Sequence, residues 1–392
     1  MTDILVISDL HCTSVGRPTE RSFLRPDLMR SPSTRHPVAS LLDLKKKNPE
    51  LRADILLCPG DVADKIDKQG LMHGVVSLNE IADEFKCRGY ISSIGNHDID
   101  SRGIHASESA DPLFIAKNIF PTRYPFVEGD LQTQFWEKGS SFHVYDDILI
   151  LNVNSVQHAG NEALAKKGRF HDIQLSFLLE QLEERKEELK TKPWIALFHH
   201  HPIQHEVHHL GADDLMENGE NLLNALIKYD CDLVIHGHKH HSRLGYYSDG
   251  AKRLPVLSAG SFSEQIHPEL AQTTSNMFHV VHIERKGFGT VDNWKFLLGH
   301  GWVPCETAAC GIEHSYGFSK IDMYDIARNK LLAHLEAGGR RGQRWVSAMG
   351  AVEELKYLNS KEIIRLEDDL ENSGYSLHRR KGHLETIFSK IS

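Results

Sequence analysis

The stretch Ile94-Gly95-Asn96-His97-Asp98 decides how the rest of the sequence is interpreted. It directly follows the strand-like run at residues 90–93, so a buried strand is expected to end here and the backbone to turn at Gly95. Asn96 then offers a neutral oxygen donor, His97 a titratable imidazole, and Asp98 a carboxylate that could orient that imidazole. Because a Gly-Asn turn is common, its importance depends on partners elsewhere in the chain.

Composition and charge predict a cytoplasmic protein without a membrane span. The chain of 392 residues carries a net charge of -9, which gives no overall attraction to nucleic acid or to an anionic membrane. Its six cysteines are scattered without the spacing of a disulfide framework, which indicates a reducing compartment. No signal-peptide pattern precedes the first strand-like run, and no apolar run approaches ~18 residues. The 26 histidines are unusual and direct attention to metal binding.

Strand-like runs recur along the chain, and each ends in polar residues. They cover residues 4–7, 54–58, 90–93, 194–198 and 233–235. Amphipathic stretches such as 71–86 and 171–190 lie between them, and this alternation predicts a parallel α/β core. Residues 141–154 predict a hairpin. Because the carboxyl ends of parallel strands meet at one edge of a sheet, the polar residues that follow them are candidates for one site.

Seven ligand-type side chains follow these runs: Asp9, His11, Asp61, Asn96, His200, His238 and His240. Carboxylate, amide and imidazole donors together suit a borderline divalent metal, with Mn preferred and Fe, Zn, Co or Ni as alternatives. Seven donors are too many for one four-coordinate zinc, but they suit two metals that share a carboxylate. Such a pair clamps a phosphoryl group and activates a hydroxide for in-line attack on phosphorus. Two divalent metal ions are therefore the predicted cofactors.

The order of these motifs resembles the calcineurin-like metallophosphoesterase superfamily. The motifs are Asp9-x-His11, Gly60-Asp61-x-x-Asp64, Gly95-Asn96-His97-Asp98, His200 two residues before a proline, and Gly237-His238-x-His240. The resemblance implies an α/β fold, a four-layer α/β/β/α sandwich, which we expect to span residues 1–300. Residues 301–392 change character and predict a small, mainly helical C-terminal extension.

The resemblance also implies a role for each site residue. One metal would take Asp9, His11, Asp61 and His240. The other would take Asp61, Asn96, His200 and His238, so that Asp61 bridges the two. His97 would be the general acid or electrostatic partner at the phosphate, oriented by Asp98, and Asp64 would support the metal ligands.

Departures from the superfamily pattern favour a phosphodiesterase. Ser/Thr protein phosphatases carry Arg-Gly where this chain has Lys65-Ile66, and Glu where it has Asp98. The segment 198–202 is similar to the His-His-Pro motif of cyclic-nucleotide and glycerophosphodiester phosphodiesterases. We therefore expect hydrolysis of a nucleotide-type phosphodiester, including a cyclic nucleotide. The long segments 13–38 and 99–140 are expected to form the walls of the substrate site.

Two alternatives remain open at this stage. The first is a metal-dependent nuclease that binds DNA or RNA through basic clusters of the C-terminal region, and the second is a non-catalytic scaffold. The clusters concerned are Arg340, Arg341 and Arg344, and the run His378-Arg379-Arg380-Lys381. A further set of histidines is expected to be structural or solvated: His199, His201, His205, His208 and His209. The oligomeric state is left undetermined by the sequence.

Overall fold

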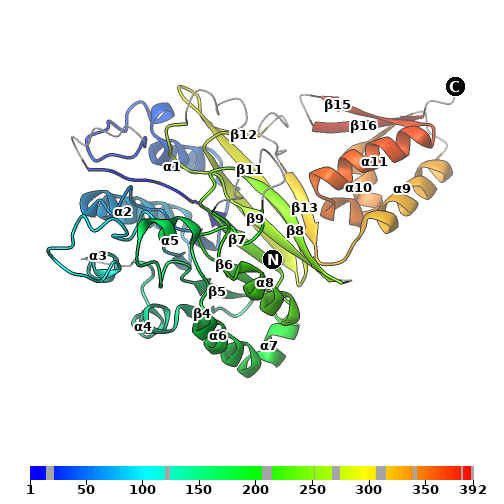
Figure 1. Cartoon of the computed structure of the whole chain (residues 1–392). Helices are drawn as coiled ribbons and strands as arrows, with labels where there is room; N and C mark the ends of the chain where they lie inside the picture. Colours follow the sequence, from blue (N-terminus) through cyan, green and yellow to red (C-terminus); the bar gives the residue numbers. More distant parts are fainter. Residues whose placement is uncertain are drawn as a thin grey trace.

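Two mixed β-sheets form the centre of the molecule, and helices cover the outer faces (Figure 1). The computed structural model describes residues 1–14, 22–119, 124–204, 214–250, 252–266, 274–305, 315–338, 342–380 and 383–389. The first sheet has the strand order β12-β11-β10-β1-β2-β3, and β13 also pairs with β11. Its strands are β1 (Thr2–Val6), β2 (Ile55–Cys58), β3 (Gly89–Ser92), β10 (Met277–Arg285), β11 (Phe288–Leu297), β12 (Gly301–Pro304) and β13 (Ser315–Ser319).

The second sheet has the strand order β4-β5-β6-β7-β9-β8. Its strands are β4 (Ser140–Val144), β5 (Leu149–Val153), β6 (Trp194–Leu197), β7 (Leu233–His236), β8 (Arg243–Asp249) and β9 (Lys252–Ser258). The antiparallel pair β4 and β5 confirms the predicted hairpin. Strands β5, β6, β7 and β9 are parallel, so their carboxyl ends lie along one edge of the sheet.

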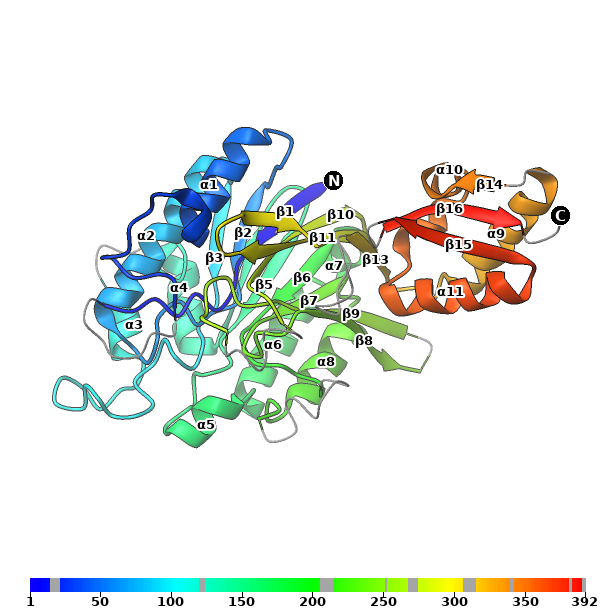
Figure 2. The ribbon, with the colours of Figure 1, turned by 90° about the horizontal axis from the view of Figure 1, so that it is seen from above.

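Helices pack on the outer face of each sheet (Figure 2). Those on the first sheet are α1 (Pro37–Lys47) and α2 (Lys68–Phe85), and those on the second are α6 (Asp172–Glu184), α7 (Lys186–Thr191) and α8 (Gly219–Lys228). Shorter elements lie in the connections: η1 (Ser33–Arg35), α3 (Phe114–Asn118), α4 (Gly129–Lys138) and α5 (Glu162–Lys167). In the described residues, no helix combines the length and hydropathy needed to cross a membrane.

The alternation of side chains along the strands explains the layers. In β6, Ile195 and Leu197 belong to the core shared by the two sheets. Their neighbours Trp194 and Ala196 belong to the core between the second sheet and its helices. Because successive strand residues point to opposite faces, a run of apolar residues buries both faces of the sheet. The predicted four-layer α/β/β/α sandwich is confirmed.

The C-terminal unit contains a small sheet that the sequence did not predict. Its elements are α9 (Tyr324–Gly338), β14 (Gly342–Arg344), α10 (Trp345–Ala351), η3 (Glu353–Tyr357), α11 (Ser360–Asn372), β15 (Tyr375–Arg380) and β16 (His383–Ser389). The three strands form an antiparallel sheet in the order β14-β16-β15, and the unit has its own apolar core. Because β12 and β13 pair with β11, the first sheet continues to Ser319. We therefore place the domain boundary near residue 320 rather than at residue 300.

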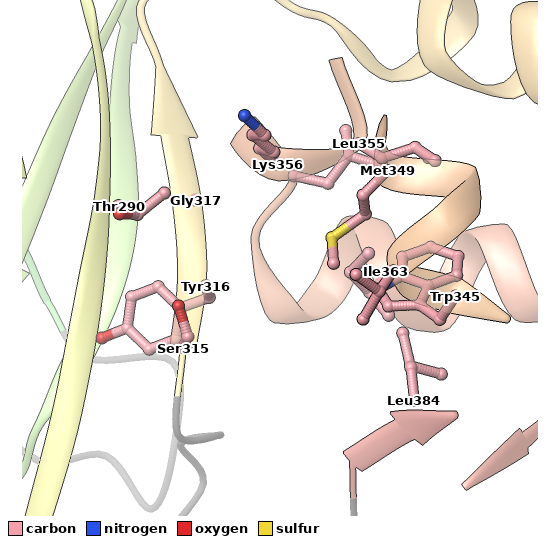
Figure 3. Close-up of a pocket in the computed structure, with 12 residues that line it drawn as sticks. Thr290, Ser315, Tyr316, Gly317, Trp345, Met349, Leu355, Lys356, Ile363 and Leu384 are labelled. Atoms are coloured by element: carbon pink, nitrogen blue, oxygen red, sulfur yellow. The ribbon is translucent and has the colours of Figure 1, made fainter. Parts of the chain in front are cut away.

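The C-terminal unit is tied to the sandwich at β13. Arg253 on β9 forms an ion pair with Glu362 on α11 at 2.8 Å and donates a hydrogen bond to the carbonyl of Ser319. Beside this contact lies a pocket of about 380 Å³ whose apolar walls include Tyr316 and Trp345 (Figure 3). It lies between β13 and the helices of the C-terminal unit.

Candidate metal centre

The sequence-predicted metal ligands, apart from His200, come together where the strands of both sheets end. Asp9 follows β1, Asp61 follows β2 and Asn96 follows β3, all from the first sheet. His199 follows β6 and His238 follows β7, both from the second sheet. The two sheets therefore supply the two sides of one buried cluster of metal-ligating groups.

A first group of donor atoms surrounds His240. Its Nε2 lies 2.9 Å from His11 Nε2 and 3.3 Å from Asp9 Oδ1. Asp61 Oδ2 lies 3.9 Å from the same nitrogen of His11. Ligands of one cation at about 2.1 Å each lie roughly 3 Å or slightly more from one another. The spacing of this group fits a bound divalent ion.

A second group of donor atoms surrounds His199. Its Nε2 lies 3.2 Å from Asp61 Oδ2, from Asn96 Oδ1 and from His238 Nδ1. One ring nitrogen carries at most one proton, so it cannot donate a hydrogen bond to three neighbours at once. The convergence of carboxylate, amide and imidazole donors at one point is what a metal ion would require.

Asp61 belongs to both groups through a single oxygen atom. Its Oδ2 faces His11 in one group and His199 in the other, while its Oδ1 accepts the backbone N–H of His97 at 2.8 Å. The chain can approach this closely because position 95 is glycine. A Cβ atom on Gly95 would lie 2.0 Å from Asp61 Oδ1. Asp61 is thus fixed as the carboxylate between the two groups.

The backbone at the ligands is unusual. Asp9, His11, Asp61, His238 and His240 all have positive φ values, between 49° and 76°. This region is uncommon for residues other than glycine and costs roughly 1–3 kcal/mol per residue when it is sparsely populated. Such conformations cluster at functional sites, where the surrounding structure holds them. The strain supports the assignment of these residues to one functional centre.

The ring nitrogens of His200 have hydrogen-bond partners outside the donor groups, which is not the arrangement of a metal ligand. It lies next to His199 and His238, but its Nδ1 is 2.8 Å from Ser155 Oγ and its Nε2 is 2.7 Å from the carbonyl of Ala165. Both ring nitrogens therefore have partners outside the cluster. We therefore propose His199 as the metal ligand in place of His200. The sequence had suggested a structural role for His199.

Strand alternation could have identified His199. Leu197 belongs to the core between the sheets and Phe198 to the core beneath the helices. Continuing this alternation places His199 on the side of the metal centre and His200 on the opposite side. Of the other histidines expected to be structural, His201 is buried beside Asp214, at 3.6 Å. His205, His208 and His209 lie outside the described residues.

Asp98 does not orient His97. Its two carboxylate oxygens accept the backbone N–H groups of Ala63 at 2.8 Å and Gly95 at 2.9 Å. Burial, followed by the charge of Asp61, raises the pKa of Asp98 to about 7. The carboxylate thus joins the turn after β2 to the turn after β3 and holds the ligand loops in place.

Asp64 is the carboxylate that contacts His97. Its Oδ1 lies 2.9 Å from His97 Nδ1, and the side chain is fully buried. Burial tends to raise the pKa of Asp64, but the hydrogen bond with His97 and the charge of that ring lower it overall. The imidazole of His97 is 15% exposed, so it reaches the open side of the centre.

Electrostatics also favour a cation in the first group. Burial would lower the pKa of His240, but its contacts with Asp9 and Glu264 raise it well above the ordinary value. Burial would raise the pKa of Asp9, but the hydrogen bond and charge of His240 lower it. These carboxylates therefore stabilise positive charge at this position. By contrast, burial and the neighbouring His97 and His240 lower the pKa of His11 to about 4, which favours the neutral, ligating imidazole.

Two carboxylates at the centre were missed by the sequence analysis. Glu264 contacts His240 Nδ1, and Asp214 lies 3.6 Å from His238 Nε2. In each case the carboxylate meets the ring nitrogen that faces away from the donor group. Both residues lie in connections far along the chain from the motifs, and neither has a sequence pattern that marks it.

Comparison with known proteins identifies the family of this chain. A model of the calcineurin-like phosphoesterase family matches residues 2–242. The chain therefore belongs to the calcineurin-like phosphoesterases, a family of metal-dependent phosphoester hydrolases with a dinuclear metal centre. No curated protein matches the chain by sequence.

Two solved structures resemble parts of this chain at low sequence identity. A purple acid phosphatase from yellow lupin (Lupinus luteus) seeds is 13% identical, with a TM-score of 0.51 over 82% of this chain. The match spans only 54% of the length of the lupin protein. A dimetal phosphatase from Danio rerio is 14% identical, with a TM-score of 0.48 over 77% of this chain and 98% of its own. The likeness to the lupin protein concerns the fold alone.

Proposed function

We propose that this protein is a dinuclear-metal phosphodiesterase acting on a nucleotide-type phosphodiester, including a cyclic nucleotide. The observation that carries the proposal is the pair of donor groups that share Asp61 Oδ2. The first group is Asp9, His11, Asp61 and His240, and the second is Asp61, Asn96, His199 and His238. When bound, two divalent ions, with Mn preferred, supply a Lewis acid and lower the pKa of water near phosphorus.

The residues of the chain hold and orient the reacting groups. Asp64 Oδ1 fixes the imidazole of His97 through its contact with Nδ1, and a ring that is protonated at both nitrogens also carries a proton on Nε2. The Nε2 atom can then donate a hydrogen bond, and finally the proton, to the departing oxygen of the ester. Because His11 and His97 meet edge to face at 4.8 Å between ring centroids, this donor lies beside the first group.

The balance of charge supports a diester rather than a monoester substrate. A phosphate monoester carries an additional negative charge, which a site commonly meets with unpaired arginine or lysine. Lys239, which lies between the ligands His238 and His240 in the chain, is paired with Asp214. Arg102 is paired with Glu162 at 2.9 Å, and Arg169 with Glu217. These cations are already neutralised, so they offer little to a second phosphate charge.

The nuclease alternative receives less support from the C-terminal unit. Arg379 is paired with Glu367, and Arg380 lies 3.4 Å from Glu385. Phosphate contacts require basic side chains that are free to meet the nucleic acid backbone. Arg340, Arg341 and Lys381 lie outside the described residues, and Arg344, which belongs to the same predicted clusters, is exposed.

A substrate panel tests the proposal. Protein supplied with Mn²⁺ is assayed for kcat/KM on bis(p-nitrophenyl) phosphate, p-nitrophenyl phosphate, 3′,5′-cyclic nucleotides, nucleoside monophosphates, and single- and double-stranded nucleic acid. We expect kcat/KM to be higher for diesters than for the matching monoesters, and to be among the highest for cyclic nucleotides. A preference for monoesters would refute the phosphodiesterase assignment, and efficient cleavage of nucleic acid would favour the nuclease.

A further inference from the structure

The carboxylate of Glu264 occupies the outer side of the His240 ring. His240 Nε2 faces Asp9 and His11, whereas its Nδ1 contacts Glu264 Oε2. A carboxylate accepts a hydrogen bond, so this contact requires the proton of the neutral ring to be on Nδ1. The lone pair of Nε2 is then directed at the first donor group.

Glu264 is itself fixed by the loop that follows β9. Its backbone N–H donates to Ser261 Oγ at 3.0 Å, and the same hydroxyl donates to the carbonyl of Asp9 at 2.7 Å. Its own carbonyl accepts a hydrogen bond from Asn276 Nδ2 at 2.8 Å. One serine therefore links the backbone of Glu264 to the backbone of a metal ligand.

In the second group, the carboxylate on the outer side of a ligand histidine belongs to Asp214, and it is shared among several partners. Asp214 lies 3.6 Å from His238 Nε2, and it also approaches His201 and Lys239. It therefore serves several partners, one of which is a lysine that competes for its charge. Glu264, in contrast, forms its ion pair with His240, and its side chain is 25% exposed at the rim of the centre.

We propose that Glu264 is the positioning residue of the first metal group, which it serves by holding His240 with Nε2 as the ligating atom. The inference rests on the two-metal centre proposed above. We expect Glu264 to affect the affinity of the first metal group and not that of the second, because it contacts a ligand of the first group and none of Asn96, His199 or His238. Carboxylates in such positions typically change metal affinity by about 10- to 100-fold when removed.

The experiment measures Mn²⁺ binding to the full chain by competition with a chelator, together with the melting temperature of each variant. The variants are Glu264→Ala, Glu264→Gln, and the control Glu80→Ala, which removes a surface carboxylate paired with Arg30. We expect Glu264→Ala to weaken one of two bound Mn²⁺ ions by roughly 10- to 100-fold. Glu264→Gln should weaken it less, because the amide oxygen can still accept the hydrogen bond from Nδ1. Glu80→Ala should bind as the wild type does.

The outcomes separate the inference from the proposed function. If the wild type binds two ions and Glu264→Ala binds both with unchanged affinity, the positioning role is refuted while the two-metal centre stands. If both ions weaken equally and the melting temperature falls, Glu264 acts on the fold, and the inference fails. If the wild type binds no second ion, the proposed function fails and the inference fails with it.

Discussion

The pairing of His97 with Asp64 leads to a sharp prediction for catalysis. Replacing Asp64 with Asn removes the charge that faces His97 Nδ1 at 2.9 Å, while the size of the side chain hardly changes. A hydrogen bond to a charged group contributes about 1.5–3 kcal/mol, and about 1.4 kcal/mol corresponds to a tenfold rate change. We therefore expect Asp64→Asn to lower kcat on bis(p-nitrophenyl) phosphate by roughly 10- to 150-fold, with the number of bound Mn²⁺ ions unchanged.

Asp98→Asn is the matched comparison. Asp98 accepts two backbone N–H groups, and an amide has only one oxygen with which to replace both acceptors. A buried donor without a partner costs about 1–3 kcal/mol, so the main effect should be a lower melting temperature. The reasoning is refuted if Asp64→Asn has wild-type kcat while Asp98→Asn loses kcat at an unchanged melting temperature.

Two further predictions concern a ligand and a surface charge cluster. His199→Ala should lower the bound Mn²⁺ from two ions to one, whereas His200→Ala should retain two, because both ring nitrogens of His200 are hydrogen-bonded elsewhere. The bound metal is measured by elemental analysis after desalting. The reverse pattern would restore His200 as the ligand. His282 lies between Asp3 at 2.7 Å and Asp292 at 3.4 Å, and although burial alone would lower its pKa, these carboxylates raise it from 6.5 to about 9. At about 1.4 kcal/mol per pKa unit, reduced for partial exposure, the contacts of His282 with the two carboxylates contribute on the order of 1–3 kcal/mol to the free energy of unfolding. This contribution is complete below pH 6.5 and is lost as the pH rises through 9. The destabilisation by His282→Leu, measured by urea unfolding, should therefore shrink between pH 6 and pH 10. A difference in unfolding free energy between variant and wild type that stays constant over this range would contradict the prediction.

The strands and the identity of most site residues follow from local patterns. Runs such as residues 4–7 are apolar on both faces, and a buried parallel strand is the structure that satisfies them. Polar residues directly after such strands meet at one edge, which is why Asp9, Asp61 and Asn96 could be predicted together. This inference needs only the order of the residues along the chain.

Roles that depend on contacts across the fold could not be obtained in this way. Asp98 is adjacent to His97 in the sequence, but it is Asp64, 33 residues away, that contacts the ring. Glu264 meets His240 through a loop after β9 for which no local pattern exists. The small C-terminal sheet was missed because β15 and β16 mix polar and apolar residues without a clear strand-like run, and their apolar side chains pack in the core of that unit.

The most direct test of the central claim is to locate the metals by anomalous scattering from crystals grown with Mn²⁺. We expect two peaks about 3.5–4 Å apart, from two ions that are both bound by Asp61, one of them also by His240 and the other by His199. A single peak, or a second peak bonded to His200 with His199 uninvolved, would contradict it.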